Sequence, residues 1–228
     1  MIVSDDSWAT FPADMLPKLF RVVDAAWQEI VPVVESDPSD RPDEKKKHEN
    51  RISRRLIVKM REKAACWPLH IDRIDSQQEI LDKHSEIGGY IDVFIARHEP
   101  DAVSFTFEAK RLNHRNSQGR WSSEAGPYVT DGMSRFISGQ YAAGQTTGGM
   151  LGYVLDGDVA RAQTAIEDKI DKEREALRLR AGETFRFSAV LPGTDHIRES
   201  HHELDQERRF IIHHLFLANH NSENGGRN

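Results

Sequence analysis

Three charged residues stand inside apolar segments of the chain, where charge is costly. Asp92 interrupts the run Tyr90–Ala96, and Glu108 and Lys110 lie at the end of the run Ser104–Lys110. A charge in apolar surroundings must be paired with an opposite charge or bound to a metal ion. These residues are the first candidates for a functional site. The simpler alternative is a structural salt bridge between Lys110 and one of the two carboxylates.

Both runs are predicted to be β-strands, because they are rich in β-branched and aromatic residues. Pro100 and Asp101 separate them, so we expect a hairpin. Side chains alternate between the two faces of a strand, and in the segment 103–110 the apolar residues share one face. Glu108 and Lys110 therefore lie together on the other face, which allows both to reach one site.

An Asp followed sixteen residues later by Glu-x-Lys resembles the active-site signature of the PD-(D/E)xK nucleases, the restriction endonuclease-like superfamily. The resemblance covers roughly residues 43–155. It implies an α/β fold with an αβββαβ core and a mixed central sheet, here extended by an N-terminal helix and a C-terminal helix–strand segment. It also implies a metal-dependent nuclease, with DNA as the first candidate substrate, in bacterial or phage-related defence, restriction or repair.

Hydrolysis of a phosphodiester needs an activated water and neutralisation of the negative charge that develops on phosphorus, and a divalent cation supplies both. Mg²⁺, or Mn²⁺ in its place, needs only one or two protein carboxylates, because such a hard ion keeps several waters. The resemblance assigns Asp92, Glu108 and the backbone carbonyl of Ala109 to the metal. It places Lys110 beside the attacking water and the scissile phosphate, where its charge stabilises the developing anion.

Many members of the superfamily add a glutamate from the helix before the first strand. Glu49 is the preferred residue for this catalytic role, and Glu44 and Glu62 stay open as alternatives.

The sequence departs from the family pattern in two places. Ile91 stands where the signature has proline, and Gln140 is followed directly by tyrosine, so the Gln-x-x-x-Tyr motif of the exonuclease branch is absent. The absence of the Gln-x-x-x-Tyr motif favours an endonuclease over an end-directed exonuclease.

The net charge of −6 argues against a general polyanion-binding protein, but two segments are locally basic. They are residues 45–63 and the segment just after Lys110. For Arg135, an exposed ion pair with Asp131, four residues earlier on the same predicted helix, is favoured over a contact with phosphate. The residues predicted to bind nucleic acid are Arg51, Arg55, Arg111, Arg115, Arg135 and Gln140.

A second class of function fits the same residues. A catalytically inactive subunit with the nuclease fold, its carboxylates held by Lys110, would recognise nucleic acid or a partner protein through the basic helix at 45–63. Carboxylates within reach of one metal in an open cleft would favour the nuclease, whereas buried or separated carboxylates would favour the binding subunit. Either protein could act as a homodimer or within a larger defence complex.

The composition of the 228 residues, with 38% hydrophobic and 30% charged, fits one domain at 1–218 and a disordered tail at 219–228. No apolar run approaches the length of a membrane span, and the first residues do not resemble a secretory signal. The single cysteine, Cys66, excludes an intramolecular disulfide and suits a cytoplasmic location. Its apolar neighbours predict a buried structural thiol.

Periodicity and turn residues predict the remaining elements. The pairs His201–His202 and His213–His214 lack cysteine partners and HExxH spacing, so no zinc site is predicted. The predicted elements are helices at 12–30, 43–64, 127–141 and 158–180, strands at 69–75, 90–96, 103–110, 150–155 and 184–190, turns or loops at 35–42, 76–89, 111–126 and 191–208, and a strand or short helix at 209–218.

Overall fold

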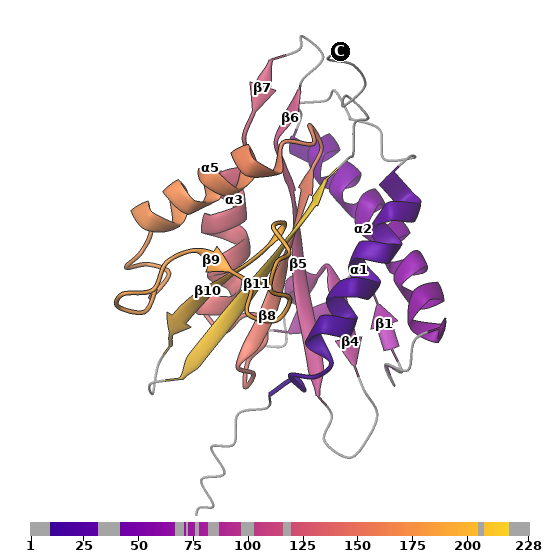
Figure 1. The fold of residues 1–228 in the computed structure, drawn as a ribbon, viewed down its shortest axis with the longest axis horizontal. Helices are drawn as coiled ribbons and strands as arrows, with labels where there is room; N and C mark the ends of the chain where they lie inside the picture. Colours follow the sequence, from indigo (N-terminus) through magenta and orange to yellow (C-terminus); the bar gives the residue numbers. More distant parts are fainter. Residues whose placement is uncertain are drawn as a thin grey trace, which may run out of the picture.

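A seven-stranded mixed sheet with helices on both faces forms the centre of the α/β fold (Figure 1). The computed structural model describes residues 10–31, 42–66, 71, 73–75, 78–81, 87–96, 103–115, 120–204 and 208–218. The expected tail at 219–228 and most of the expected linker at 35–42 lie outside these residues.

The central sheet has the strand order β1-β4-β5-β8-β11-β10-β9. Strand β5 is antiparallel to β4 and parallel to β8, and β8 is parallel to β11. Two small antiparallel sheets, β2-β3 and β6-β7, stand outside it. The strands are β1 (Arg73–Asp75), β2 (Gln78–Leu81), β3 (Ile87–Ile91), β4 (Val93–Ala96), β5 (Ser104–Leu112), β6 (His114–Arg115), β7 (Trp121–Ser122), β8 (Thr147–Val154), β9 (Arg186–Phe187), β10 (Ile197–Glu203) and β11 (Arg209–Ala218).

Helices α1 (Leu16–Ile30) and α2 (Pro42–Cys66) cover one face of the sheet (Figure 1). The buried stripe of α1 follows the three-and-four spacing of its apolar residues. Trp27 lies in that stripe, where its ring stacks on Tyr153 of β8 and its Nε1–H donates to the carbonyl of Ala218, 2.8 Å away. These contacts fix α1 against the middle of the sheet.

The opposite face is covered by α3 (Ala125–Pro127), the π-helix η2 (Tyr128–Met133), α4 (Ser134–Ile137) and α5 (Val159–Lys172). A Cβ atom on Gly132 would lie 3.5 Å from Cγ of Glu108 and 2.5 Å from Cε of Met150. The absence of a side chain at Gly132 therefore lets η2 lie directly against β5 at Glu108. Asp158 caps the N-terminus of α5, because its carboxylate accepts the N–H of Arg161.

Several predicted elements are corrected by the structure. The segment 76–89 contains β2 and most of β3, the segment 111–126 contains β6 and β7, and α5 ends at Lys172. The strand predicted at 184–190 shrinks to two residues, and the segment 209–218 is a strand. Cys66 is exposed at the end of α2, whereas a buried thiol was predicted. The helix predicted at 127–141 is divided into α3, η2 and α4, and the strand predicted at 90–96 is interrupted at Asp92. The other predicted helices and strands are present with shifted ends.

Strand β10 was predicted to be an irregular loop, because its sequence is polar. Its inward side chains are buried within a chain of hydrogen bonds that crosses the sheet. The Tyr128 hydroxyl donates to Nδ1 of His214 (2.9 Å), whose Nε2–H donates to Oγ of Ser200 (2.9 Å). The Ser200 hydroxyl donates to Nε2 of His202 (2.8 Å), whose Nδ1–H donates to the carbonyl of Leu177 (2.7 Å). The direction is fixed because a carbonyl only accepts, and both imidazoles must be neutral.

Candidate active site

The site forms where the sheet opens beside β5. Strand β4 pairs with β5 only as far as Val93, opposite Phe107, whereas β5 continues along β8 to Leu112. The strand predicted at 90–96 is broken at Asp92, which lies between β3 and β4. Beyond the break, the edge of β5 presents main-chain groups that β4 no longer pairs.

Carboxylates take over those main-chain groups. The N–H of Ala109 donates to Oδ2 of Asp92 (2.9 Å), and the N–H of Arg111 donates to Oε2 of Glu49 (2.8 Å). The ammonium of Lys110 donates to the carbonyl of Ala109 (3.0 Å). Two acidic side chains from a strand break and from α2 are thus oriented by the backbone of β5 itself.

Glu108 and Lys110 complete the group. Glu108 is fully buried, and its Oε1 accepts from Nζ of Lys110 at 2.5 Å and from Nη1 of Arg135 at 2.7 Å. Nζ of Lys110 also lies 3.5 Å from Oε1 of Glu49. The structure therefore brings Asp92, Glu108, Lys110 and Glu49 together around the opened edge of β5.

Three carboxyl groups, those of Asp92, Glu49 and Glu108, lie near the two cations Lys110 and Arg135. Burial and the nearby charge of Glu108 raise the pKa of Asp92 to about 8, although Lys110 opposes the change. Burial also raises the pKa of Glu49. Although burial lowers the pKa of Lys110, the three carboxylates hold it above its usual value, so Lys110 stays charged.

One oxygen of the buried carboxylate of Glu108 lacks a partner. Both cations bind Oε1, and Oε2 has no hydrogen-bond partner among the described residues. A buried carboxylate oxygen in that state is costly unless something else binds it. Asp92, Glu108 and the Ala109 carbonyl are oxygen ligands of the kind that Mg²⁺ prefers, and the unpartnered Oε2 fits a cation.

Across the described part of the chain, no group of three or more His, Cys, Asp or Glu side chains is arranged to hold a metal ion. The predicted ligand set differs from such a group, because it has two carboxylates and one backbone carbonyl. Such a sparse set suits Mg²⁺, which retains much of its hydration shell.

The alternatives to Glu49 lie elsewhere. Glu62 is exposed on α2 and accepts from Lys59 at 2.7 Å. The side chain of Glu44 lies outside the described residues. Glu49 is thus the glutamate of α2 that the structure places beside Lys110, at 3.5 Å.

The residues predicted to bind nucleic acid have different surroundings. Arg51 and Arg55 are exposed on α2. Arg111 is 3% exposed, and its Nη1 lies 3.1 Å from Nδ1 of His48, so the prediction of a surface phosphate contact is wrong for this side chain. The side chain of Arg115 lies outside the described residues, and Gln140 is half-buried after α4.

Arg135 corrects a second expectation. Instead of an exposed ion pair with Asp131, its guanidinium contacts Glu108 and the hydroxyl of Tyr141, which lies 2.7 Å from Nη1. Tyr141 is the last residue of the helix predicted at 127–141, and no role at the site was predicted for it. Its role at the site was missed, because nothing in the local pattern connects it to Glu108.

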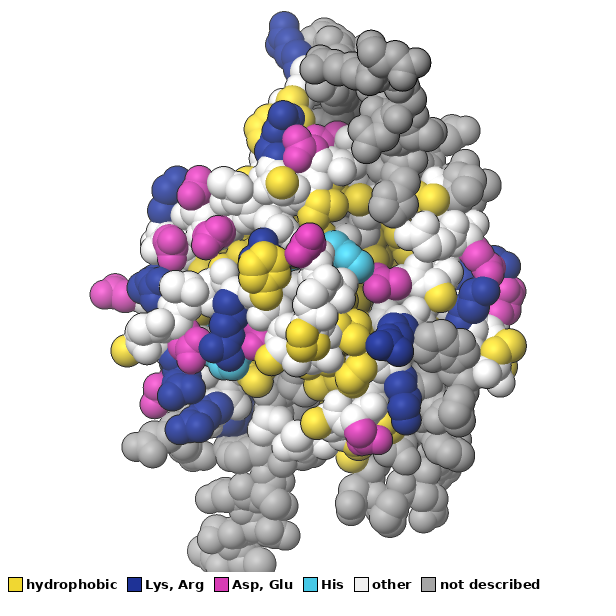
Figure 2. Space-filling model, in the orientation of Figure 1, with side chains coloured by type: hydrophobic (Ala, Val, Ile, Leu, Met, Phe, Trp, Pro, Cys, Tyr) yellow, Lys and Arg dark blue, Asp and Glu magenta, His cyan; other side chains and the backbone are white. Residues whose placement is uncertain are grey.

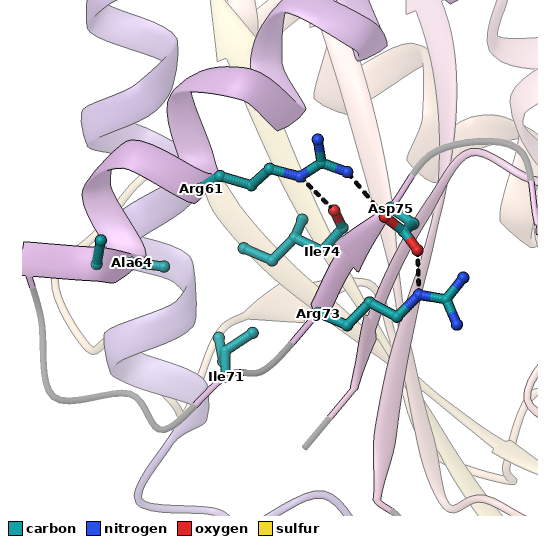
Figure 3. Close-up of a pocket in the computed structure, with 7 residues that line it drawn as sticks. Arg61, Ala64, Ile71, Arg73, Ile74 and Asp75 are labelled. Carbon is teal, nitrogen blue, oxygen red and sulfur yellow. Dashed lines mark hydrogen bonds and ion pairs between the residues drawn. The ribbon is translucent and has the colours of Figure 1, made fainter. Parts of the chain in front are cut away.

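Other polar features lie away from this group. The hollow between the end of α2 and β1 is lined by Arg61, Arg73 and Asp75, among others (Figure 3). Both arginines pair with Asp75, and Arg61 also donates to the carbonyl of Ile74. On the face shown in Figure 2, Lys and Arg side chains are interspersed with Asp and Glu side chains. The described residues of that face therefore form no single continuous basic area for a polyanion.

Comparison of the chain with protein-family models, with curated proteins and with solved structures gives no match. The resemblance to a nuclease thus depends on the residues of the site and on their arrangement. Among the helices in the described residues, none has both the length and the apolar character needed to cross a membrane.

Proposed function

We propose that this protein is a divalent-metal-dependent nuclease of the PD-(D/E)xK type, with DNA as its first candidate substrate. The observation that carries the proposal is the meeting of Asp92, Glu108, Lys110 and Glu49 at the opened edge of β5, with one oxygen of Glu108 left unpartnered. A purely structural ion pair would need neither the unpartnered oxygen nor the additional carboxylates.

The order of elements supports a restriction endonuclease-like core. Helix α2 is followed by β1 and by the antiparallel pair β4-β5, and then the segment from α3 to α4 leads to β8, parallel to β5. This order agrees with the αβββαβ arrangement that the resemblance implies. In this order Asp92 lies just before β4, the strand that pairs with β5, and β5 carries Glu108 and Lys110.

The residues that would hold Mg²⁺ or Mn²⁺ are Asp92, Glu108 and the carbonyl of Ala109, with Glu49 nearby. Such a cation, when bound, lowers the pKa of a bound water and neutralises charge on the phosphate. The Ala109 N–H orients Asp92, and Lys110 and Arg135 orient Glu108.

Lys110 supplies a fixed positive charge. Its ammonium is held between Glu108 and Glu49, and the surrounding carboxylates keep its pKa above the usual value. It therefore acts as an electrostatic stabiliser and not as a general base at neutral pH. A preoriented cation in a site with little water stabilises the charge that develops on the phosphate oxygens.

A catalytically inactive binding subunit is the second candidate. It is favoured by the complete burial of Glu108, which is the arrangement expected of a binding subunit, and by the ion pairs of Glu108 with Lys110 and Arg135, which hold this carboxylate in place without a metal. Its nucleic-acid or protein partner would contact the exposed basic residues of α2, among them Arg51 and Arg55.

Cleavage assays separate the two candidates. Circular DNA, linear DNA and RNA are incubated with the protein in Mg²⁺, in Mn²⁺ and in EDTA, because only an endonuclease cuts the circular substrate. We expect metal-dependent cleavage that Asp92→Asn and Lys110→Met abolish. Glu62→Gln on α2 and Lys172→Met on α5, both exposed and outside the site, are the controls and should retain activity.

Cleavage that survives both Asp92→Asn and Lys110→Met would refute the proposed site. Binding of nucleic acid without cleavage of any substrate would favour the second candidate. A defence, restriction or repair setting stays a prediction from the resemblance. A cytoplasmic location, which the single cysteine suggested, and a homodimer or larger complex also stay predictions.

A further inference from the structure

Arg135 reaches the buried Glu108 from the helical layer. Its Nη1 donates to Oε1 of Glu108 and to the hydroxyl of Tyr141, both at 2.7 Å, and its guanidinium carbon lies 5.3 Å from the centre of the Tyr141 ring. The side chain of Arg135 is 32% exposed, whereas that of Glu108 is fully buried. Arg135 therefore connects the inner carboxylate to the surface through a guanidinium held on two sides.

Tyr141 is itself held rigidly. It is 1% exposed and packs edge-to-face on Phe136, with ring centres 5.7 Å apart. The chain reverses after α4 through Gly139, whose φ of +74° favours glycine, and the Tyr141 N–H then donates to the carbonyl of Arg135 at 2.9 Å. A backbone and a side-chain hydrogen bond thus join the two residues, so the position of Arg135 is set by Tyr141.

The consequence for Glu108 is asymmetric. Arg135 and Lys110 both donate to Oε1, which leaves Oε2 buried and without a hydrogen-bond partner among the described residues. Gly132 brings η2 against the stem of the same side chain. The carboxylate is therefore held in one orientation, with one oxygen paired twice and the other buried without a hydrogen-bond partner among the described residues.

We infer that Arg135 and Tyr141 are positioning residues, which hold Glu108 so that Oε2 is available to a divalent cation. This inference rests on the proposed function, because it concerns the cation of that site. Groups that orient a metal ligand from behind commonly change metal affinity by about 10- to 100-fold when they are removed.

The test measures Mn²⁺ binding to the full chain by isothermal titration calorimetry, without nucleic acid. We expect Arg135→Gln and Tyr141→Phe each to weaken Mn²⁺ binding by about 10- to 100-fold. Arg135→Lys, which keeps a donor and the positive charge, should retain more affinity than Arg135→Gln. In cleavage assays the loss should lie in the metal dependence and in kcat, with KM for DNA little changed.

Matched controls separate positioning from loss of stability. Tyr128→Phe also removes a buried hydroxyl, here one bonded to His214 on β11. Arg161→Gln also removes a guanidinium that pairs with a carboxylate and lies over an aromatic ring, those of Asp158 and Trp121. Both controls should bind Mn²⁺ as the wild type does, and thermal unfolding confirms that each variant is folded at the assay temperature.

The possible negative results have different meanings. Wild-type protein that binds Mn²⁺, together with Arg135→Gln and Tyr141→Phe variants of equal affinity, would overturn the inference and leave the proposed function standing. Wild-type protein that neither binds Mn²⁺ nor cleaves any substrate would remove both. An equal loss of affinity in the Tyr128→Phe control would also overturn the inference, because it would show a general effect of stability.

Discussion

Replacing His213 with leucine should make the fold more resistant to acid. His213 is 2% exposed and lies 5.2 Å from the ring of Phe20 and 6.4 Å from that of Phe105. Neither of its ring nitrogens has a hydrogen-bond partner among the described residues, and the nearest carboxylate oxygen, on Glu199, is 4.0 Å away. The cost of burying a charged imidazole here is therefore poorly compensated, and burial lowers the pKa of His213 to about 4.

The magnitude follows from linkage between protonation and folding. In the unfolded chain the imidazole titrates near 6.5, so below that pH the unfolded state binds a proton that the folded state refuses until about pH 4. The contribution of the neutral, buried His213 to the free energy of unfolding is thus fully present above pH 6.5 and is lost as the pH falls toward 4. The full difference corresponds to about 3 kcal/mol, of which about 2 kcal/mol is lost between pH 7 and pH 5.

Urea unfolding followed by tryptophan fluorescence at pH 7, 6 and 5 measures this effect. At pH 7 we expect His213→Leu to be as stable as the wild type or more so, because no hydrogen bond is lost. Between pH 7 and pH 5 the variant should lose about 2 kcal/mol less than the wild type. Equal losses in the two proteins would refute the reasoning.

His196 provides a control of opposite sign. It is hydrogen-bonded to Asp24 at 3.0 Å, and this bond raises the pKa of the imidazole. The stabilisation that protonated His196 provides is therefore fully present below the pKa that this imidazole has in the unfolded chain. It is lost as the pH rises through the higher pKa that the imidazole has in the folded protein. His196→Asn should remove this loss at rising pH and leave the acid-side effect of His213 unchanged.

Two further substitutions test the packing that positions the site. Trp27→Phe should lower the free energy of unfolding by about 1 to 3 kcal/mol, because it leaves the Ala218 carbonyl without its 2.8 Å donor, and a loss below 0.5 kcal/mol in urea unfolding would contradict this. Gly149→Ala should cost about 1 to 3 kcal/mol, since the new Cβ would lie 2.3 Å from Cδ1 of Phe107 on β5; an unchanged thermal midpoint would show that the ring moves aside freely.

The local sequence pattern determined the elements whose apolar residues follow a simple period. The stripe of α1 and the hairpin of β4 and β5 were predicted correctly in type and approximate position. Alternation along β5 also placed Glu108 and Lys110 near one another, because two residues separated by one position point to the same face of a strand. These features depend only on neighbours in the chain, so the sequence alone was sufficient.

The tertiary structure decided which partners the polar residues find. Strand β10 reads as a polar loop, yet His202 and Ser200 are buried because donors and acceptors on distant segments satisfy them. In the same way, burial of Arg111 and the contact of Arg135 with Glu108 depend on packing between elements far apart in the sequence.

The candidate site shows the same division. The residue types and spacing identified Asp92, Glu108 and Lys110, but the break at Asp92 and the capping of the β5 edge by carboxylates appear only in the folded chain. The physical reason is that periodicity reports which face of an element a residue occupies. The free-energy cost of burying a charge depends on the groups that pack against that face. Only the assembled sheet and helices determine which groups these are.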